Sequence, residues 1–451
     1  MARALVLPKR SPVARLELNP AQTIVAGFAA IILSGAILLS LPVAASDGTP
    51  TPFLTALFTA TSATCVTGLV VVDTATHYSL FGQLVIMVLI QLGGLGYMTA
   101  ATMMAMIVGR RIGLRERLIL QEAYNLYTVG GVVRFTRDIA LLTVAIEATG
   151  TLLLTLRWLP DFGPVRALYL GIFHSISAFN NAGFDLMGNF RSLTAYVGDP
   201  VVTLVVAGLI IVGGLGFTVL IDLKTPRRLS LHARVVLTTT AALIGLGTTL
   251  ILLLEFTNRA TLGPLSAGQR MLAAFFQSVT PRTAGFNTVN IGALRDPTLM
   301  LLIALMFIGA SPGGTGGGIK TTTFVAPMAV IISMLRGRPD PELFRRRLPP
   351  VVIYKAVTIA LLAVAFVVTM ATLLSLVERV EFIAALFEVV SAFGTVGLST
   401  GITPHLSAAG RVLIMATIFT GRVGLLTVAF ALTRRQQPAD VRYPEERLYV
   451  G

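Results

Sequence analysis

Charged side chains are scarce in this sequence of 451 residues. Asp, Glu, Lys and Arg account for 12% of it, whereas hydrophobic residues account for 55%. Soluble globular domains carry about a quarter charged residues, so this chain lacks the polar surface that a water-soluble protein of several domains needs. Its composition predicts a protein whose surroundings are mostly lipid.

Cysteine and histidine are scarce as well. Cys65 is the single cysteine, which excludes an internal disulfide. No cluster of polar residues suggests a catalytic centre, so we expect neither an enzyme nor an organic cofactor. His174 is interpreted as a packing residue on a short helix. The first apolar stretch, 22–44, is too long for the core of a signal peptide and is expected to be retained as a helix.

The net charge of +14 is concentrated between the apolar segments. Nucleic-acid binding would need the basic residues on one soluble face, so it is not expected. Basic residues in short loops beside apolar spans mark the cytoplasmic side of a membrane. Five stretches contain 24 of the 35 Lys and Arg residues, namely 3–15, 110–137, 224–234, 336–355 and 434–447.

Eight apolar segments could cross a bilayer, whose hydrocarbon core of about 30 Å requires roughly 20 residues of helix. They are 22–44, 79–108, 139–158, 198–222, 235–256, 297–334, 352–377 and 408–432. The basic stretches fall at the N-terminus, after every second span and at the C-terminus. The positive-inside rule therefore predicts eight crossings with both termini in the cytoplasm.

Each pair of spans encloses a shorter apolar segment that is expected to enter the membrane and return. These segments are 52–69, 166–186, 266–288 and 381–400. The sequence thus predicts an all-α membrane protein of four tandem repeats, each a span, a re-entrant loop and a second span. The predicted repeats are 22–108, 139–222, 235–334 and 352–432, with cytoplasmic segments at 1–21, 109–138 and 433–451.

The four re-entrant segments share a pattern, because each has a Phe ten positions before a Gly. These glycines are Gly68, Gly183, Gly285 and Gly397. A Ser lies six positions before the Gly in three segments, whereas the third has Val279 there and Ser278 one place earlier. Four converging loops would form a ring of backbone carbonyls that replaces the hydration shell of a cation, with Gly tolerating the unusual backbone angles. A central pseudo-fourfold ion pore is predicted.

The span 297–334 is too long for one crossing, and its middle, 309–320, is rich in Gly and contains a Pro. Such a composition cannot remain helical, and unwound backbone at membrane depth lines a cavity. A gate, a transporter's substrate site and a nucleotide-binding loop are the competing interpretations. Ile319 separates Gly318 from Lys320, which breaks the order of a nucleotide-binding loop. We expect only the third repeat to be broken in this way.

Four of the charged residues inside the apolar segments bear on function. Lys320 and Arg422 are intramembrane charges, which are costly and indicate function. Arg422 is expected either to hydrogen-bond the carbonyls of residues 309–318 and hold them closed, or to extend to the membrane interface. Arg282 either shapes the field of the ring or pairs with an acidic neighbour, and Glu388 is equally ambiguous.

These motifs together resemble the Trk/Ktr/HKT superfamily of potassium transporters, and most closely its KtrB-type pore subunits. The resemblance extends over essentially the whole chain. The residues that carry it are 64–68, 180–184, 281–287, 313–320, 394–397, 421–424 and 442–447.

The resemblance implies potassium uptake across the bacterial cytoplasmic membrane, often promoted by sodium ions. The implied selectivity filter for potassium ions consists of Val66, Thr67, Gly68, Asn181, Ala182, Gly183, Thr283, Ala284, Gly285, Thr395, Val396 and Gly397. The implied gate consists of Gly313, Gly314, Thr315, Gly316, Gly317, Gly318, Lys320 and Arg422. A homodimer with one pore per chain is also implied, together with a cytoplasmic KtrA-like ring of regulatory subunits that bind ATP or ADP.

Two alternatives stay open. One is a sodium-permeable or Trk-type cation transporter; a Ser in place of the first-loop Gly marks many sodium-permeable members, so Gly68 favours potassium. The other is a secondary transporter with its substrate at the broken helix. That class is expected to have two inverted repeats, whereas this chain has four units of the same direction.

Overall fold

The computed structural model describes residues 20–96, 99, 132–224, 229–432 and 446. The predicted cytoplasmic segments 1–21, 109–138 and 433–451, and the motif at 442–447, lie almost wholly outside these residues. The described chain is mostly helical, as the sequence predicts. Its strands β1 (Glu342–Leu343) and β2 (Arg346–Arg347) form an antiparallel hairpin between two helices. Short helical turns in the loops are α3 (Thr74–His77), Pro42–Ala44, Thr194–Tyr196, Ile291–Ala293 and Thr403–His405.

Four long helices are apolar enough to cross a membrane. They are α1 (Pro20–Ser40), α7 (Val132–Phe162), α11 (Leu231–Glu255) and α15 (Pro350–Glu378). Each coincides with the predicted first span of a repeat, and at 1.5 Å per residue each is about 30 Å long or longer. One bent helix pair brings the candidate spans among the described residues to at most five.

A shorter helix follows each long one, inside the segment predicted to be re-entrant. These short helices are α2 (Phe53–Thr64), α8 (Pro164–Phe179), α12 (Ala267–Val279) and α16 (Phe382–Gly394). With 12 to 16 residues they are too short to cross a bilayer. Each packs against the long helix that precedes it, so a long helix and a short helix form the repeating hairpin of the fold.

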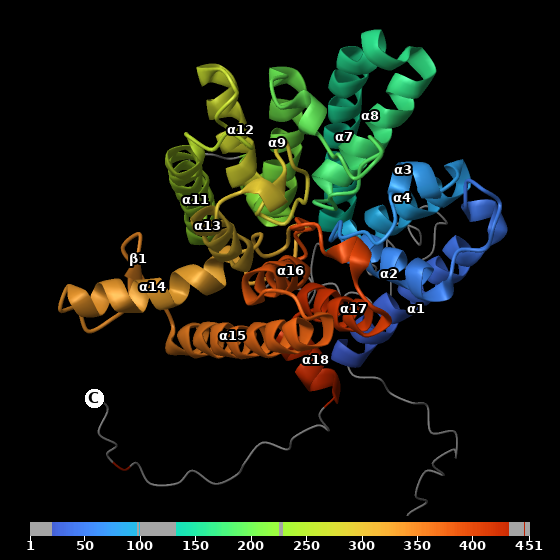
Figure 1. The fold of residues 1–451 in the computed structure, drawn as a ribbon. Helices are drawn as coiled ribbons and strands as arrows, with labels where there is room; N and C mark the ends of the chain where they lie inside the picture. The colour runs from blue at the N-terminus through green and yellow to red at the C-terminus, as the bar shows by residue number, and fades with distance from the viewer. Residues whose placement is uncertain (1–19, 97–98, 100–131, 225–228, 433–445, 447–451) are drawn as a thin grey trace, which may run out of the picture.

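The four hairpins surround a common centre in the order of the chain (Figure 1). A further helix follows each hairpin: α4 (Leu80–Leu95), α9 (Pro200–Leu215), α13 (Asp296–Phe307) and α17 (Ala408–Val423). These four helices link neighbouring hairpins, since α4 contacts α8, α9 contacts α12, α13 contacts α16 and α17 contacts α2. The last contact closes the arrangement, because α2 belongs to the first hairpin.

The expectation that only the third repeat has a broken helix is wrong. Gly216 separates α9 from α10 (Phe217–Asp222), and Gly424 separates α17 from α18 (Leu425–Leu432), which are bent by 98° relative to each other. Helix α4 also ends at a glycine, Gly96. The φ angles are 80° for Gly96, 93° for Gly216 and 94° for Gly424, a conformation that favours Gly. In the third repeat, residues 308–320 separate α13 from α14 (Thr321–Leu335).

A recurring sequence motif ends at Gly96, Gly216 and Gly424. It is Gly-Gly-Leu-Gly at 93–96 and 213–216, and Gly-Arg-Val-Gly at 421–424. The first glycine of each motif packs against a carbonyl in the last turn of a short helix, where a Cβ would collide with Thr64 O, Phe179 O or Phe393 O. The first glycine of the motif therefore lets two helices approach closely, and the last glycine, three residues later, marks the end of the helix.

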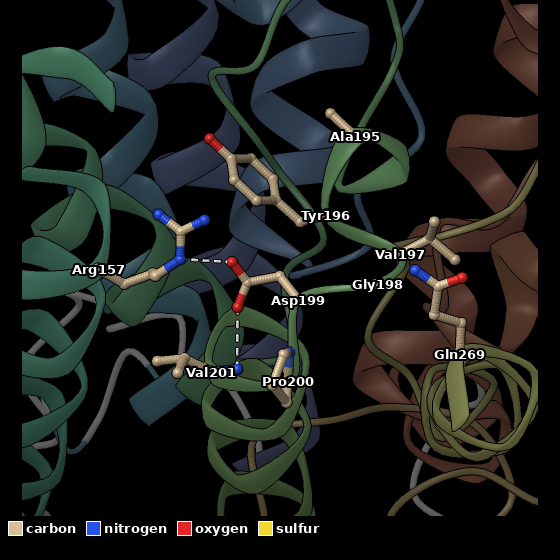
Figure 2. Close-up of a pocket in the computed structure, with 9 residues that line it drawn as sticks. All are labelled: Arg157, Ala195, Tyr196, Val197, Gly198, Asp199, Pro200, Val201 and Gln269. Carbon is tan, nitrogen blue, oxygen red and sulfur yellow. Dashed lines mark hydrogen bonds and ion pairs between the residues drawn. The ribbon is translucent and has the colours of Figure 1, made fainter. Parts of the chain in front are cut away.

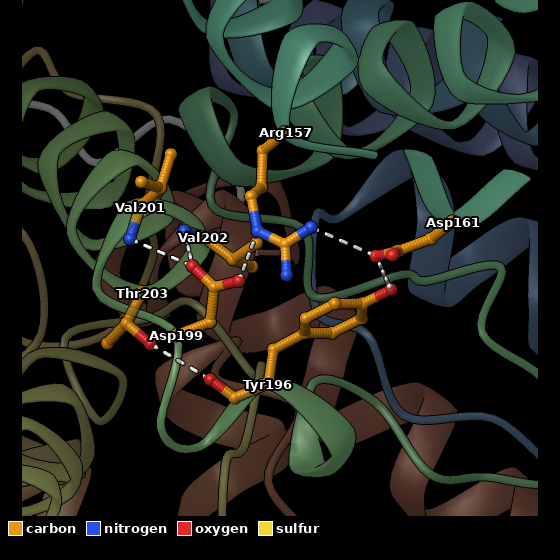
Figure 3. Close-up of polar contacts among 7 residues, drawn as sticks. All are labelled: Arg157, Asp161, Tyr196, Asp199, Val201, Val202 and Thr203. Atoms are coloured by element: carbon orange, nitrogen blue, oxygen red, sulfur yellow. Dashed lines mark hydrogen bonds and ion pairs between the residues drawn. The ribbon is translucent and has the colours of Figure 1, made fainter. Parts of the chain in front are cut away.

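In each repeat a contact, which we call the clasp, joins the last turns of the long helix, or the turn just after it, to the start of the following linking helix. In the second hairpin this clasp is an ion pair, with 2.5 Å between Arg157 Nε and Asp199 Oδ2 (Figure 3). Asp199 also caps α9, because its Oδ1 accepts hydrogen bonds from the amides of Val201 (2.9 Å) and Val202 (3.1 Å). The corresponding contacts elsewhere are Ser79 to Val43 O, Arg295 N to Glu255, and Ser407 N to Glu378.

We expect Asp199→Ala to lower the stability of the protein by about 1 to 2 kcal/mol, since it removes both a helix cap and an ion pair. Asp199→Asn keeps an oxygen that can cap α9, so it should lower the stability less. Thermal unfolding of the purified protein in detergent measures both effects. Equal unfolding temperatures for wild type and Asp199→Ala would contradict the assigned role of this clasp.

Candidate functional site

The four glycines singled out by the sequence meet in one closed ring. A Cβ built on Gly68 would lie 3.0 Å from Gly183 Cα, and one on Gly183 would lie 3.0 Å from Gly285 Cα. The same construction gives 3.2 Å from Gly285 to Gly397 Cα and 3.1 Å from Gly397 to Gly68 Cα. Segments more than 100 residues apart in sequence are therefore neighbours, in chain order, around one axis.

Backbone carbonyls fill the space beside each glycine. The Cβ positions of Gly68, Gly183 and Gly285 would lie 2.6, 2.7 and 2.5 Å from Ala182 O, Ala284 O and Val396 O. The fourth, on Gly397, would collide with Thr67 O. In every case the oxygen belongs to the residue that precedes the next glycine. Any side chain at these positions would displace a carbonyl of the ring.

The backbone adopts the same unusual shape in all four loops, which we call the ring loops: residues 66–68, 181–183, 283–285 and 395–397. The first residue of each has a positive φ, with values of 50° for Val66, 56° for Asn181, 67° for Thr283 and 49° for Thr395. Positive φ is rare for residues with a side chain, and rarer still for β-branched ones such as Val and Thr. Strain of this kind persists only where the surrounding structure enforces it, and it clusters at functional sites.

Hydrogen bonds to the end of each short helix enforce this shape. The amides of Thr67, Ala182 and Val396 donate to the backbone carbonyls of Ser62, Ser177 and Ser391, each at 2.8 Å. The hydroxyls of Ser62 and Ser391 also accept from the amides of Gly68 and Gly397 at 3.1 Å. The Ser six positions before the Gly thus ties the helix end to the loop.

The connection between the short helix and the third ring loop is one residue shorter than in the other repeats, which corrects the alignment made from the sequence. Thr280, and not Ser278, takes the place of the Ser: its carbonyl accepts from Ala284 N (3.0 Å). Its hydroxyl donates to Phe286 O (2.5 Å), as Ser177 does to Phe184 O (2.7 Å). Phe276 is likewise the fully buried counterpart of Phe58, Phe173 and Phe387, whereas Phe275, ten positions before Gly285, is half-buried.

The glycine-rich segment, residues 309–320, lies against three of the four ring loops. Thr315 is fully buried, and its hydroxyl contacts Asn181 Oδ1 (2.9 Å) and Phe179 O (3.2 Å). The amide of Gly317 donates to Thr395 Oγ1 (3.0 Å). A Cβ on Gly316 would collide with the side chain of Thr283. The segment therefore touches the first residue of the second, third and fourth ring loops.

Two basic side chains hold the glycine-rich segment. Arg422 donates to Thr315 O and to Gly93 O, so that one guanidinium joins α17, α4 and the segment. Lys320 Nζ donates to Gly316 O (2.7 Å) and Gly317 O (3.4 Å). The expected contact of Arg422 with the carbonyls of this segment is present, and these internal acceptors leave no reason for its guanidinium to extend to the interface.

The other polar residues singled out in the sequence are His174, Glu388 and Arg282. The contacts of His174 and Glu388 indicate structural roles. His174 packs edge-on against Trp158, with 5.0 Å between ring centroids. Glu388 accepts hydrogen bonds from Ser399, Thr400 and Thr403, so it fastens the chain that follows the fourth ring loop. Arg282 is buried and forms no ion pair among the described residues. Within the described part of the chain, no three His, Cys, Asp or Glu residues gather into a metal-binding group.

A surface cavity of about 560 Å³ lies apart from the ring, between the second and third hairpins (Figure 2). Arg157, Tyr196 and Asp199 line one side of it, and Gln269 of α12 lines the other. None of the ring-loop residues or residues 309–320 line it. The charged groups of the cavity, Arg157 and Asp199, belong to the clasp described above, and Gln269 takes part in the cap of α12, so the ring remains the candidate site.

The fold and the site define a multi-pass membrane protein of the cation-transporting class. The family model for TrkH, described as a cation transport protein, matches residues 12–441. The chain therefore belongs to the TrkH family of cation transport proteins, a family of ion transporters and not of enzymes.

Curated relatives match the chain over nearly its whole length. The Ktr system potassium uptake protein B of Bacillus subtilis is 42% identical, and the match covers 99% of this chain and 100% of that protein. The potassium/sodium uptake protein NtpJ of Enterococcus hirae is 39% identical, with 97% and 98% covered. The crystal structure of TrkH from Vibrio parahaemolyticus has a TM-score of 0.72 at 16% identity, covering 94% of this chain and 87% of that one. This last likeness concerns the fold alone.

Proposed function

We propose that this chain is the pore of a potassium uptake system in the bacterial cytoplasmic membrane. The observation that carries the proposal is the closed ring of Gly68, Gly183, Gly285 and Gly397, in which each glycine faces a carbonyl of the next loop. A ring of carbonyls at membrane depth replaces the water of a cation. Potassium as the ion is supported by the curated names of relatives such as the Ktr system potassium uptake protein B.

In this proposal the selectivity filter is formed by the four ring loops, residues 66–68, 181–183, 283–285 and 395–397. The short helices α2, α8, α12 and α16 end just before these loops. The C-terminal end of a helix carries partial negative charge, which favours a cation nearby. The repeated positive φ at the first residue of each loop supports one common conformation with its carbonyls directed at the axis.

The gate is formed by Gly313, Gly314, Thr315, Gly316, Gly317, Gly318 and Lys320, with Arg422 as its latch. The contacts of Thr315 and Gly317 with Asn181 and Thr395 support this role, because they place the segment against the filter. A backbone of consecutive glycines can change conformation at little steric cost, and the other broken helices have one glycine at the break instead of a long loop.

The four hairpins with their linking helices form four repeats that cross the membrane eight times, with both termini in the cytoplasm. The proposal extends to a homodimer with one pore per chain and to a cytoplasmic regulatory ring that binds ATP or ADP. The names of the Ktr system relatives support a multi-component system, and that of NtpJ supports a contribution of sodium ions. Reporter fusions that place either terminus outside the cell would overturn this topology.

The test of the proposed function is growth of a potassium-auxotrophic host at low potassium, with and without a co-expressed regulatory subunit. We expect the chain to restore growth, more strongly with the regulatory subunit, and to increase uptake of rubidium as a tracer for potassium. A chain that reaches the membrane but restores growth under neither condition would contradict the proposal. Restored sodium uptake without potassium uptake would favour the sodium-permeable alternative.

A further inference from the structure

A polar cluster, in which Asn180 is fully buried and Gln91 and Glu147 are half-buried, lies beside the second ring loop and belongs to neither the ring nor the glycine-rich segment. It joins Gln91 of α4, Glu147 of α7 and Asn180 at the end of α8. Asn180 Nδ2 donates to Gln91 Oε1 (2.9 Å) and Glu147 Oε1 (3.0 Å), and Gln91 Nε2 lies 3.4 Å from Glu147 Oε2. The cluster therefore links the first and second hairpins in the interior of the protein.

Glu147 has no positive partner in the part of the chain that the structure describes. It lies within the apolar helix α7 and forms no ion pair among the described residues. Carboxyl groups inside a membrane are costly and are a functional hypothesis by default. The acceptors and donors that surround this one are side-chain amides, so the carboxyl group serves to hold Asn180 and Gln91 in place.

The structurally equivalent position in the third repeat is apolar. Ser175 donates to Glu147 O (2.7 Å), and Ser278 donates to Ile244 O (2.8 Å). Because Ser175 and Ser278 each lie two positions before the residue that ties its short helix to the ring loop, Glu147 corresponds to Ile244. The hairpin fold itself does not require a carboxyl group at this place.

Asn180 connects the cluster to the ring, because it is directly followed by the second ring loop. It is fully buried, it ends the short helix α8, and the next residue, Asn181, begins the second ring loop with a φ of 56°. The side-chain oxygen of Asn180 packs closely against Gly94, because a Cβ on Gly94 would collide with Asn180 Oδ1. Asn181 in turn donates to Arg282 O (3.1 Å) beside the third ring loop.

From these contacts we propose that Glu147 is a positioning residue for cation discrimination, acting through Gln91 and Asn180 on the second ring loop. This inference depends on the proposed function of the ring as a selectivity filter. Asn180 Nδ2 also donates to Ile176 O (2.9 Å) within its own helix. Without the carboxyl group it therefore loses the acceptor that ties the junction between α8 and the ring loop to α7. The four loops then no longer hold their carbonyls at one common spacing, and discrimination between potassium and sodium ions falls.

The decisive experiment compares potassium and sodium uptake by wild type, Glu147→Ile and Glu147→Gln at matched protein levels. Glu147→Ile, which copies the third repeat, should reduce the preference for potassium about tenfold, the effect of losing one or two hydrogen bonds. Glu147→Gln keeps an oxygen that accepts from Asn180 and should restore most of the preference. The control is Thr149→Val, on an exposed face of the same helix, which should leave the preference unchanged.

Gln91→Leu decides the case in which Glu147→Ile fails to fold, because it removes a member of the cluster from a different helix. We expect a smaller loss of preference in the same direction. If folded Glu147→Ile and Gln91→Leu proteins both keep the wild-type preference, the inference is wrong although the ring still transports potassium. Absence of potassium uptake by the wild type would instead refute the proposed function itself.

Discussion

Deletion of residues 314–317 is expected to raise potassium flux by roughly 30-fold where the closed state dominates. The deleted residues contribute the hydrogen bonds from Thr315 to Asn181 and from Gly317 to Thr395, and the carbonyl that accepts from Arg422. Losing two such bonds, at about 1 kcal/mol each, shifts an equilibrium between closed and open states by about that factor. Tracer uptake into cells or liposomes measures the flux.

A milder variant separates the gate from the folding of the segment. Arg422→Ala leaves the glycine-rich segment intact and removes only its ties to α17 and α4, so it should raise flux in the same direction. The preference for potassium should stay near the wild-type value in both variants, because the ring loops are unchanged. Unchanged flux in Arg422→Ala and in the deletion would remove the gating role from this segment.

Gly285→Ser is expected to reduce the preference for potassium over sodium by at least about tenfold. The new Cβ would lie 2.5 Å from Val396 O in the neighbouring ring loop, so that carbonyl has to move away from its place in the ring. The φ of Gly285 is 77°, where a residue with a side chain adds strain of about 1 to 2 kcal/mol. A displaced carbonyl weakens the coordination on which discrimination depends.

The matched control for Gly285→Ser is Gly245→Ser in α11 of the same predicted repeat. A Cβ on Gly245 meets nothing within 4 Å, and its φ is in the ordinary range, so this variant should keep both flux and preference. Competition of sodium with rubidium uptake measures the preference in both variants. Equal competition in Gly285→Ser and wild type would exclude Gly285 from the filter.

Several features of the site were predictable from local sequence. The four glycines and the glycine-rich segment follow from composition and spacing, because backbone with positive φ or close carbonyl contacts requires Gly at fixed positions. The residues before the glycines were implied only by the family resemblance. The contact between Arg422 and the glycine-rich segment was one of two alternatives predicted for this residue, since a charge in an apolar segment needs internal acceptors or access to the interface. These predictions rest on properties of individual residue types, such as the backbone angles that only Gly adopts easily and the polar acceptors that a charge needs. Such properties can be recognised in the sequence.

Other features were missed because they depend on alignment in space. Counting back from Gly285 gave Val279 and Phe275 as the counterparts of the Ser and the Phe, and the structure shifts both by one residue, to Thr280 and Phe276. The breaks at Gly216 and Gly424, and the end of α4 at Gly96, were overlooked although the Gly-X-X-Gly motif recurs. Single glycines are common inside helices, and whether the helix breaks there depends on how the residues that follow pack against the rest of the protein.

By itself, the sequence determined a helical membrane protein with four similar units and a glycine at the same place in each. Composition, apolar length and repeated spacing are properties of the chain alone, so they were readable from it. Only the tertiary structure decided which groups meet: that Gly397 closes the ring against Gly68, that Thr315 lies on Asn181, and that Glu147 reaches Asn180. Such contacts join residues 33 to 329 positions apart, and they form only when the four hairpins pack together.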